Sequence, residues 1–324
     1  MRSTRFKSIV NKMRGRRIAV LGDLMVDEYI FGESSRISRE APVLILDYRM
    51  RHVGFGGASN AVANIAALGG VPIPVGCIGD DDNGKSLIEL FNQQNVDTSG
   101  VIIKSGIATV CKTRILAGGM HTLRQQIVRI DREPEVPPDP DEVLEKAEEI
   151  FKRADAVLVS DYGCGTLSKK TISYINGIAK NGKIVAIDSR FQLHRFKNAS
   201  LAAPNEEEAG IHAGHGADDI DNIEKMGETL RKKLKSRGLL ITRGSEGISL
   251  FEDGSKPYHV PVFGSKVAVD NTGAGDTVVS AALLSLCAGA DYREAVQIAN
   301  RAGGLVVMKK GAATVSPEEL ISTI

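Results

Sequence analysis

The sequence of 324 residues has no tryptophan, only four cysteines and no long apolar run. The cysteines are scattered without a CxxC pair, and a chain of this length can bury a core without disulfides. We therefore expect free thiols in a reducing, cytoplasmic environment. No segment approaches the roughly 18–20 consecutive apolar residues that span a bilayer, so we predict no membrane partner.

Excess charge of one sign is also missing. Lys and Arg number 41, Asp and Glu number 40, and the formal net charge is +1. This balance gives no global attraction to nucleic acid or to an anionic membrane, and we predict neither as a partner. The six histidines show no HExxH or similar spacing, so the sequence does not support a zinc site.

Residues 1–17 are an exception, because they carry several basic residues and no acidic one. This composition is also typical of transit peptides and of nucleic-acid-binding arms. However, four apolar side chains follow the i, i+3, i+4, i+7 pattern of one helix face: Phe6, Ile9, Val10 and Met13. We predict a short helix that docks against the domain through this face.

Apolar β-type runs alternate with amphipathic stretches along most of the chain. Strands are predicted at Arg17–Leu21, Pro72–Ile78, Ala156–Ser160, Ile184–Asp188 and Leu239–Thr242, and helices at Gly57–Leu68, Lys85–Gln94, Asp141–Arg153, Lys169–Asn181 and Asp221–Arg237. Strand–helix alternation predicts an α/β fold whose mostly parallel central sheet is covered by helices on both faces. We interpret residues 1–324 as a single domain.

Two regions interrupt this alternation. Tyr29–Val53 and Gly106–Arg129 have strand-type patterns with no helix between their strands. They predict antiparallel strands outside the main sheet, which we interpret as a small β-sheet lid formed by about residues 29–53 and 106–130. The Pro-rich stretch Glu133–Glu142 then predicts a loop that returns the chain to the main layer.

The most informative segment is Thr272–Thr277, which opens a helix of small apolar residues with the sequence TGAGDT. Its glycines let the backbone approach a ligand closely, and the unpaired N–H groups of a helix start favour a negative charge. Such a pocket suits a phosphoryl group in transfer. Asp276 lies in the first turn, where its carboxylate could accept a proton from an attacking hydroxyl. The alternative is that Asp276 only caps the helix.

This segment resembles one signature of the ribokinase-like, or pfkB, family of carbohydrate kinases, DNTGAGDT at 270–277. The run GGASN at Gly56–Asn60, continuing AVANIAALGG, resembles the other. The resemblance covers essentially the whole chain and implies a three-layer α/β/α sandwich with a small β lid. It also implies an ATP-dependent sugar kinase in which Asp276 is the catalytic base. The implied anion hole comprises Gly273, Ala274 and Gly275.

The resemblance also assigns nucleotide and metal sites. Asn205 and Glu208, in the run NEEE, match a family element that helps to place Mg²⁺ and phosphate, and Mg²⁺ does prefer carboxylates, waters and phosphates. The alternative is a solvated helix start. The implied nucleotide-binding residues are Asn205, Thr242, Gly244, Gly247, Asn300 and Gly303. A monovalent cation near Asp270 and Gly311 is left open.

The sugar site is assigned in the same way. Asp27 matches the family's hydroxyl-binding aspartate, and carboxylate and amide groups suit vicinal hydroxyls. Asp161 follows an apolar strand, and open α/β sheets bind ligands at the carboxyl ends of their strands. The implied substrate-binding residues are Asp27, Gly56, Gly57, Asn60, Lys112, Arg114 and Asp161.

Further segments resemble the kinase half of the bacterial heptose-7-phosphate kinase/adenylyltransferases: residues 22–32, 35–42, 160–162 and 311–320. That resemblance implies phosphorylation of O1 of D-glycero-β-D-manno-heptose 7-phosphate, and we expect a kinase half without the adenylyltransferase half. A phosphorylated substrate needs cations, and several fall in or near the lid: Arg36, Arg39, Lys112, Arg114 and Arg129. Lid cations can also be merely solubilising.

Other outcomes stay open at this point. The related kinases tend to have Asp-Pro-Lys where this chain has Asp188-Ser189-Arg190, which could change substrate contacts. The substrate could be another sugar, such as ribose or fructose, or the protein could be a sugar-binding regulator without catalysis. Family resemblance implies a homodimer paired through the lid.

One segment matches a sequence pattern that is typical of a different kind of ATP site. Gly79–Ser86 reads GDDDNGKS and satisfies the P-loop pattern GxxxxGK[ST]. A P-loop presents backbone N–H groups to phosphates, and three consecutive carboxylates there would repel them. We therefore predict that this segment does not bind ATP. The first predicted strand also lacks the GxGxxG that a dinucleotide-binding enzyme would need.

Overall fold

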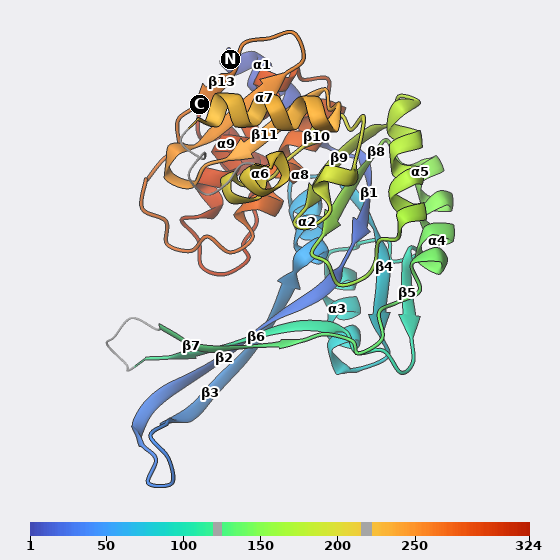
Figure 1. Ribbon diagram of the computed structural model, residues 1–324. Helices are drawn as coiled ribbons and strands as arrows, with labels where there is room; N and C mark the ends of the chain where they lie inside the picture. The colour runs from blue at the N-terminus through green and yellow to red at the C-terminus, as the bar shows by residue number, and fades with distance from the viewer. Residues whose placement is uncertain (119–124, 215–221) are drawn as a thin grey trace.

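Two sheets organise the chain in the computed structural model, which describes residues 1–118, 125–214 and 222–324 (Figure 1). The larger sheet has nine strands in the order β13-β12-β11-β10-β9-β8-β1-β4-β5. These strands are β1 (Arg17–Gly22), β4 (Val71–Gly79), β5 (Val101–Lys104), β8 (Ala156–Asp161), β9 (Ile184–Ser189), β10 (Leu201–Ala202), β11 (Gly238–Thr242), β12 (Ile248–Glu252) and β13 (Tyr258–Val260). Pairing is parallel from β11 to β5, and only β12 and β13 run antiparallel to their neighbours.

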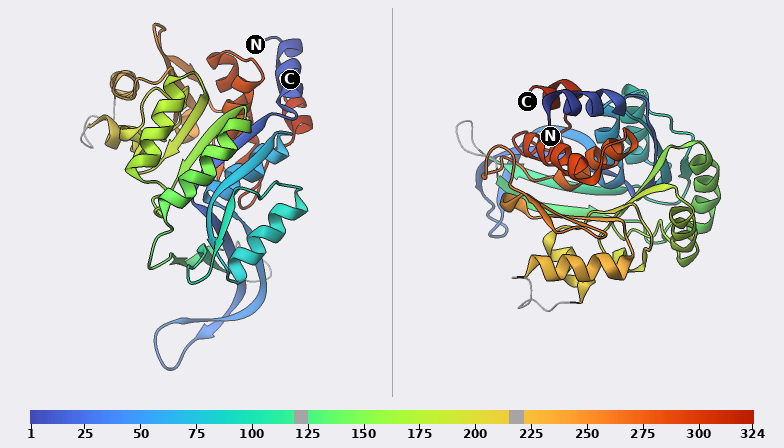
Figure 2. Two further views of the ribbon diagram at one scale, coloured as in Figure 1. Left: turned by 90° about the vertical axis from the view of Figure 1, so that its right-hand side faces the viewer. Right: turned by 90° about the horizontal axis from the view of Figure 1, so that it is seen from above.

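Helices cover both faces of this sheet (Figure 2). One layer contains α1 (Ser3–Met13), α2 (Gly57–Ala67), α3 (Asp82–Gln93), α8 (Ala274–Cys287), α9 (Tyr292–Val306) and α10 (Pro317–Ile321), and the other contains α4 (Pro140–Arg153), α5 (Lys169–Lys180), α6 (Glu206–Ala213) and α7 (Ile223–Leu234). Short 3₁₀ turns lie at Leu193–Arg195 and Gly244–Glu246. The predicted α/β/α sandwich with a mostly parallel central sheet is confirmed.

The period of two along the strands divides the hydrophobic core into two clusters. In β1, Ile18 and Val20 pack with α2 and α8, whereas Ala19 and Leu21 pack with α4 and α5 on the opposite face. A strand buried on both faces must be apolar at every position, which is why these strands are continuous apolar runs in the sequence. The parallel strands end at a shared edge, where their carboxyl-terminal residues meet.

The smaller sheet projects from this edge, as Figure 1 shows. Its four strands have the order β3-β2-β6-β7, with bounds β2 (Leu24–Ile37), β3 (Leu44–Gly56), β6 (Val110–Ala117) and β7 (Gln125–Arg132). The prediction of purely antiparallel strands is wrong in one respect, because the central pair β2 and β6 is parallel. Two separate hairpins, each antiparallel internally, join side by side. Residues 119–124 of the second predicted lid segment lie outside the described residues.

The N-terminal helix α1 buries the four side chains that the sequence pattern selected. Phe6, Ile9, Val10 and Met13 are each at most 2% exposed and belong to the same core cluster as α8. Arg5 anchors the helix further, because its guanidinium donates hydrogen bonds to both carboxylate oxygens of Glu294 on α9. The predicted docked helix is therefore confirmed. Within the described ranges, no helix is both long and apolar enough to cross a bilayer.

Candidate active site

The candidate residues gather at the carboxyl edge of the main sheet. Asp161 ends β8, Asp188 lies at the end of β9, Asn205 follows β10 and Thr242 ends β11. The N-terminus of α8 faces the same edge, so Asp276 shares a cavity with all four. Residues from separate parts of the sequence thus meet because parallel strands present their carboxyl ends together.

The Asp276 carboxylate is held from two sides. Asn60, on α2, donates from Nδ2 to Oδ2 at 2.8 Å, and the Tyr162 hydroxyl donates to Oδ1 at 3.1 Å. Asp276 is only 4% exposed, so these bonds fix a buried carboxylate in one orientation. Each oxygen retains a further lone pair that can accept a hydrogen bond from a ligand.

Burial raises the pKa of Asp276 to about 6, against the opposing hydrogen bonds from Asn60 and Tyr162. Nearby charges act in both directions, since Asp27 raises this pKa and Lys112 lowers it. A carboxylate with a pKa in this range is ionised at neutral pH and is a stronger proton acceptor than an ordinary aspartate. The environment therefore suits a general base.

Asp276 is not the cap of its helix. The N-cap position of α8 is Gly273, and no side chain makes a cap hydrogen bond there. Asp276 is the third helical residue and directs its carboxylate to Asn60 and Tyr162 instead. The capping alternative is therefore wrong. The N–H groups of Gly275 and Asp276 find no acceptor among the described residues and remain available to a ligand.

Gly273 is required at the turn for two reasons. Its φ is +74°, a left-handed conformation that side chains disfavour, and a Cβ there would lie 2.2 Å from Asn60 Nδ2. Behind it, Asn64 Nδ2 donates to the Asn60 carbonyl, and the Thr277 hydroxyl donates to Asn64 Oδ1 at 2.8 Å. The chain from Thr277 through Asn64 to Asn60 thus ties α8 to α2 and supports the Asp276 carboxylate.

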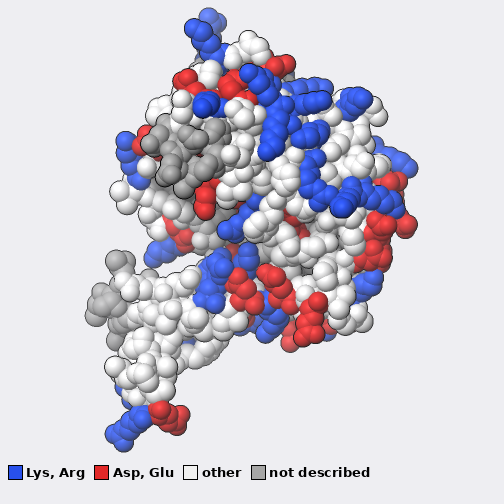
Figure 3. Space-filling view, viewed as in Figure 1, with Lys and Arg blue, Asp and Glu red and all other residues white. Residues whose placement is uncertain are grey.

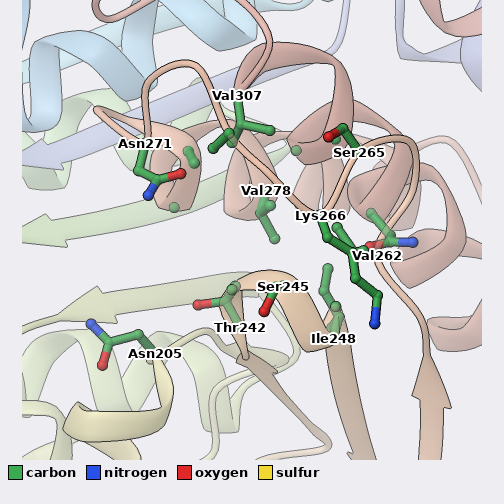
Figure 4. Close-up of a pocket in the computed structure, with 18 residues that line it drawn as sticks. Asn205, Thr242, Ser245, Ile248, Val262, Ser265, Lys266, Asn271, Val278 and Val307 are labelled. Carbon is green, nitrogen blue, oxygen red and sulfur yellow. The ribbon is translucent and has the colours of Figure 1, made fainter.

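A larger cavity of about 630 Å³ lies between α8, α9 and the loop after β11 (Figure 4). Apolar side chains of Ile248, Val262, Val278 and Val307 line it, together with Thr242, Gly244, Gly247, Asn300 and Gly303. The amide of Asn300 donates to the Pro261 carbonyl at 2.8 Å and so supports the wall of the cavity. A pocket lined by apolar side chains together with a few polar groups is typical of a small-molecule or cofactor site.

A smaller cavity of about 510 Å³ contains Asp276 and continues from the larger one. Five residues line both: Asn205, Thr242, Asn271, Ala274 and Gly275. The glycine turn therefore lies at the junction of the two cavities. A ligand whose ring occupied the larger cavity could extend a chain of anionic groups past this turn to Asp276.

Asn205 and Glu208 form a reciprocal capping box at the start of α6. Asn205 Oδ1 accepts from the Glu208 N–H at 2.8 Å, and Glu208 Oε2 accepts from the Asn205 N–H at 3.1 Å. Burial raises the pKa of Glu208. Both side chains line the smaller cavity, and no cluster of three metal-ligating side chains occurs in the described part of the chain. A cation held here would depend on ligand oxygens and water for most of its coordination.

The predicted sugar-binding residues cluster where the smaller sheet meets the main one. Asp27 and Lys112 are register partners on β2 and β6, and Arg114 pairs with Asp27 Oδ1 at 2.9 Å. Gly56 permits this arrangement, since a Cβ there would lie 2.8 Å from Asp27 Oδ1, and Gly57 follows it at the start of α2. The ammonium of Lys112 lies 5.2 Å from the centre of the Tyr162 ring, which connects this cluster to Asp276.

Two predicted site residues have other partners. The Asn60 amide bonds Asp276, and the Asp161 carboxylate accepts from the Ser189 hydroxyl at 2.5 Å and from the Gly163 N–H at 3.1 Å. Asn60 thus supports the carboxylate of Asp276, and Asp161 supports the backbone at Gly163 and the side chain of Ser189.

The proposed lid cations separate into two groups. Arg36 lies near the end of β2 and Arg39 in the turn that follows it, and Figure 3 shows charged side chains at that tip beyond a mostly uncharged surface. Arg129 pairs with Asp131 at 2.7 Å. Lys112 is opposite Asp27, Arg114 forms an ion pair with it, and Arg129 is opposite Arg114 on β7, whereas Arg36 and Arg39 lie at the far end of the sheet, so the structure does not bring all five cations together within this chain.

Sequence reasoning missed the roles of Tyr162 and Asp23. Asp23 is 2% exposed and accepts the N–H groups of Tyr162 at 2.7 Å and Cys164 at 3.2 Å, which positions the loop that carries the tyrosine. A buried acid directly after β1 was the available signal. The contact of Tyr162 with Asp276 had no local signal, because 114 residues separate them.

The local structure of the P-loop-like segment Gly79–Ser86 does not favour phosphate binding. Asp81 caps α3 by accepting the Gly84 N–H at 2.8 Å, and it also accepts from the N–H and hydroxyl of Thr109. Its carboxylate therefore occupies the place that a phosphate would take. Lys85 is exposed and lies 3.8 Å from Asp80. The structure supports the prediction that this segment is not an ATP site.

Comparison with protein families identifies a match over residues 16–319, to the model described as pfkB family carbohydrate kinase. The Bifunctional protein HldE of Pelobacter propionicus is 36% identical over 323 residues, which cover 98% of this chain and 65% of that protein. The protein of the same name from Geobacter metallireducens is 37% identical over 94% of this chain and 62% of its own length. The chain thus spans somewhat less than two thirds of these relatives.

Solved structures show the same fold. Phosphofructokinase-2 from Escherichia coli, in complex with substrates and products, superposes with a TM-score of 0.76 at 18% identity over 95% of this chain and 97% of its own. Arabidopsis thaliana ribokinase, complexed with ribose and ATP, gives 0.72 at 21% identity over 95% and 98% of the two chains.

Proposed function

This chain belongs to the pfkB family of carbohydrate kinases, and we propose that Asp276 is the general base with which it phosphorylates a sugar phosphate. The family makes it a phosphotransferase with an alcohol group as acceptor. The observation that carries the proposal is the position of Asp276, buried, held by Asn60 and Tyr162, at the junction of two continuous cavities.

The larger cavity is the proposed ATP site. Its apolar walls accept the adenine, and its outlet leads past Gly273, Ala274 and Gly275 to Asp276. Free N–H groups at the start of α8 then face the transferring phosphoryl group. Donors fixed in advance in this way can lower a barrier substantially, since removing one typically costs about 10²–10³-fold in rate.

Mg²⁺ is the divalent cation we propose for this site, placed near Asn205 and Glu208. When bound, it would neutralise phosphate charge. The carboxylate of Glu208 retains one oxygen outside the capping box, which fits a cation that keeps waters and phosphate oxygens as its other ligands. A monovalent cation near Asp270 and Gly311 remains part of the proposal; the two are already joined, because Asp270 Oδ2 accepts the Gly311 N–H at 2.9 Å.

The sugar is proposed to lie between Asp276 and the smaller sheet, under Asp27, Gly56, Gly57, Lys112 and Arg114. Asp27 would accept sugar hydroxyls, while the cations beside it would attract a phosphate monoester. We further propose D-glycero-β-D-manno-heptose 7-phosphate as the acceptor, phosphorylated at O1. The support is the identity of 34–37% to relatives named HldE and the sequence segments shared with heptose-7-phosphate kinases.

We also propose that the smaller sheet acts as a lid, that the chain is one kinase domain, and that it works in the cytoplasm as a homodimer. Several large apolar side chains on the smaller sheet and its β2–β3 turn are exposed, which supports a covering partner: Ile37, Val43, Leu44, Tyr48, Met50 and Ile130. Burying them against a second copy would remove apolar surface from water.

A substrate panel tests the function directly. ATP consumption should be measured with ribose, fructose, fructose 6-phosphate and D-glycero-β-D-manno-heptose 7-phosphate at equal concentrations. We expect the highest kcat/KM with the heptose phosphate, because Lys112 and Arg114 lie beside the hydroxyl-binding Asp27. A higher value with an uncharged sugar would contradict the phosphosugar proposal, and no turnover with any sugar would contradict the kinase proposal.

Replacing Tyr162 by phenylalanine should move the pH profile. The Tyr162 hydroxyl donates to Asp276 and lowers its pKa, so its loss should raise that pKa above about 6. The base is ionised only above its pKa, so kcat/KM should fall as pH decreases through this value, and the fall should begin at higher pH in Y162F. If kcat/KM begins to fall at the same pH in Y162F as in the wild type, the ionisation of Asp276 does not determine that fall.

Replacing Lys85 by alanine should leave the kinetics unchanged. Lys85 is exposed and its loop is closed by Asp81, so it has no role in the proposed ATP site. The steady-state KM for ATP and kcat are the measurements. A large loss of ATP affinity in K85A would favour the P-loop interpretation after all.

A further inference from the structure

Acidic side chains predominate among the titratable groups that line the smaller cavity. Its lining includes five carboxylates, Asp161, Asp188, Glu207, Glu208 and Asp276. Burial and the repulsion of Asp276, Glu208 and Asp161 raise the pKa of Asp188 well above its ordinary value. A polyanionic phosphate chain cannot enter such a space unless cations offset the repulsion. Among the described residues, Arg190 is the single lysine or arginine that lines this cavity.

The backbone of Arg190 is fixed at the end of β9. Its N–H donates to the Asp161 carbonyl at 3.0 Å, and the His212 ring nitrogen Nε2 lies 3.0 Å from its carbonyl oxygen. These two bonds connect Arg190 to β8 on one side and to α6 on the other. The backbone of Arg190 therefore has a defined position relative to Asp161 on β8 and Glu208 on α6.

The side chain of Arg190, unlike its backbone, contacts an aromatic ring. Its guanidinium carbon lies 5.6 Å from the centre of the Phe191 ring, and it forms no ion pair within the parts of the chain that the structure describes. Its charge nevertheless acts on the cavity, because it opposes the burial that raises the pKa of Glu208. A guanidinium that is carried by a fixed backbone, is exposed and lacks an ion-pair partner, beside a cavity lined by carboxylates, is available for an anionic ligand.

We propose that Arg190 is a further catalytic residue, which binds the γ-phosphoryl group of ATP in the smaller cavity during its transfer. This inference rests on the proposed function. The planar fork of N–H donors matches two phosphoryl oxygens at once, and phosphoryl transfer spreads negative charge over those oxygens. Arg190 would approach from β9, opposite the amides of Gly275 and Asp276 on α8.

The bonds and protons balance without any change to Arg190. The sugar oxygen forms a bond to the γ-phosphorus as the bond from that phosphorus to the β–γ bridging oxygen breaks. ADP leaves with the bonding electron pair, and the proton of the sugar hydroxyl goes to Asp276. Arg190 contributes charge and hydrogen bonds to the transferring group.

The test compares a nucleotide with a γ-phosphate and one without. Affinities of the full chain for AMP-PNP and for ADP, each with Mg²⁺, should be measured by calorimetry in the wild type, R190A, R190Q and R190K. We expect R190A and R190Q to bind AMP-PNP about tenfold more weakly, with ADP affinity unchanged. R190K should recover part of the loss because it keeps the charge but not the fork. With the accepted sugar, kcat should fall about 10²-fold in R190A.

Arg195 provides the matched control. Its guanidinium donates to the Gln192 side chain, and it does not line the smaller cavity, so R195A should leave both affinities and kcat unchanged. Equal affinities of R190A and wild type for AMP-PNP, an equal loss for both nucleotides, or an unchanged kcat would each overturn the proposal. If no sugar supports turnover in the wild type, the proposed function fails, while the nucleotide comparison still decides whether Arg190 contacts the γ-phosphate.

Discussion

Replacing Asp276 by asparagine is expected to reduce kcat at least about 10²-fold, the lower end of what general-base catalysis contributes. Asparagine keeps the size of the side chain and can still accept the hydrogen bond from Asn60, but it cannot accept a proton from the sugar hydroxyl. Positioning and the N–H groups of the α8 turn remain, so some turnover should persist. The measurement is the steady-state rate with the best sugar of the panel, with the ATP affinity determined in parallel.

The thermal stability of the same variant separates catalysis from folding. Because burial raises the pKa of Asp276 to about 6, the ionised carboxylate opposes folding above that pH, whereas below about 4 the protonated group does not. Removing the charge should therefore leave Tm unchanged or higher at pH 8. ATP affinity should also stay close to that of the wild type. Near-normal turnover in D276N would contradict the assignment of Asp276 as the base, and a large drop in Tm would show that the carboxylate is structural.

Periodicity was sufficient to predict the main layers of the fold. The predicted strands at 17–21, 156–160 and 184–188 agree with β1, β8 and β9 to within one residue at each end. Strands buried on both faces are apolar throughout, which is a local and strong signal. In contrast, β10 has only two residues, Leu201 and Ala202, and its pairing comes from neighbouring strands, so no pattern in the sequence could indicate it.

Contacts between distant segments explain what could not be predicted. Asn60 and Asp276 are 216 residues apart, and from sequence the amide was assigned to sugar binding instead of to a bond with the base. The parallel pairing of β2 with β6 also joins two hairpins that each look antiparallel in isolation. The acidic run after β4 was informative, however, because consecutive carboxylates repel phosphate, and in the structure one of them, Asp81, accepts the Gly84 N–H.

Replacing Gly275 by alanine should reduce kcat by about 10²-fold or more without destabilising the protein. Gly275 is the second residue of α8, and a Cβ built there meets no atom within 4 Å. Alanine is also favoured over glycine in a helix, so Tm should be unchanged or higher. Yet Gly275 lines both cavities, and a methyl group at their junction would occupy the path of the phosphates and displace them from the N–H donors. Kinetics and Tm are measured on the same preparation.

Two further substitutions distinguish a methyl group that blocks the phosphate path from one that disturbs the glycine turn. Gly177, in α5, also has open space where a Cβ would lie and is outside both cavities, so G177A should leave kcat unchanged and Tm unchanged or higher. G273A should lower both, because its Cβ would lie 2.2 Å from Asn60 Nδ2 at a φ of +74°. A G275A variant with full activity would mean that phosphates do not pass the α8 turn. Asp276 would then lack the neighbouring donors on which its assignment as the base of a phosphoryl transfer depends.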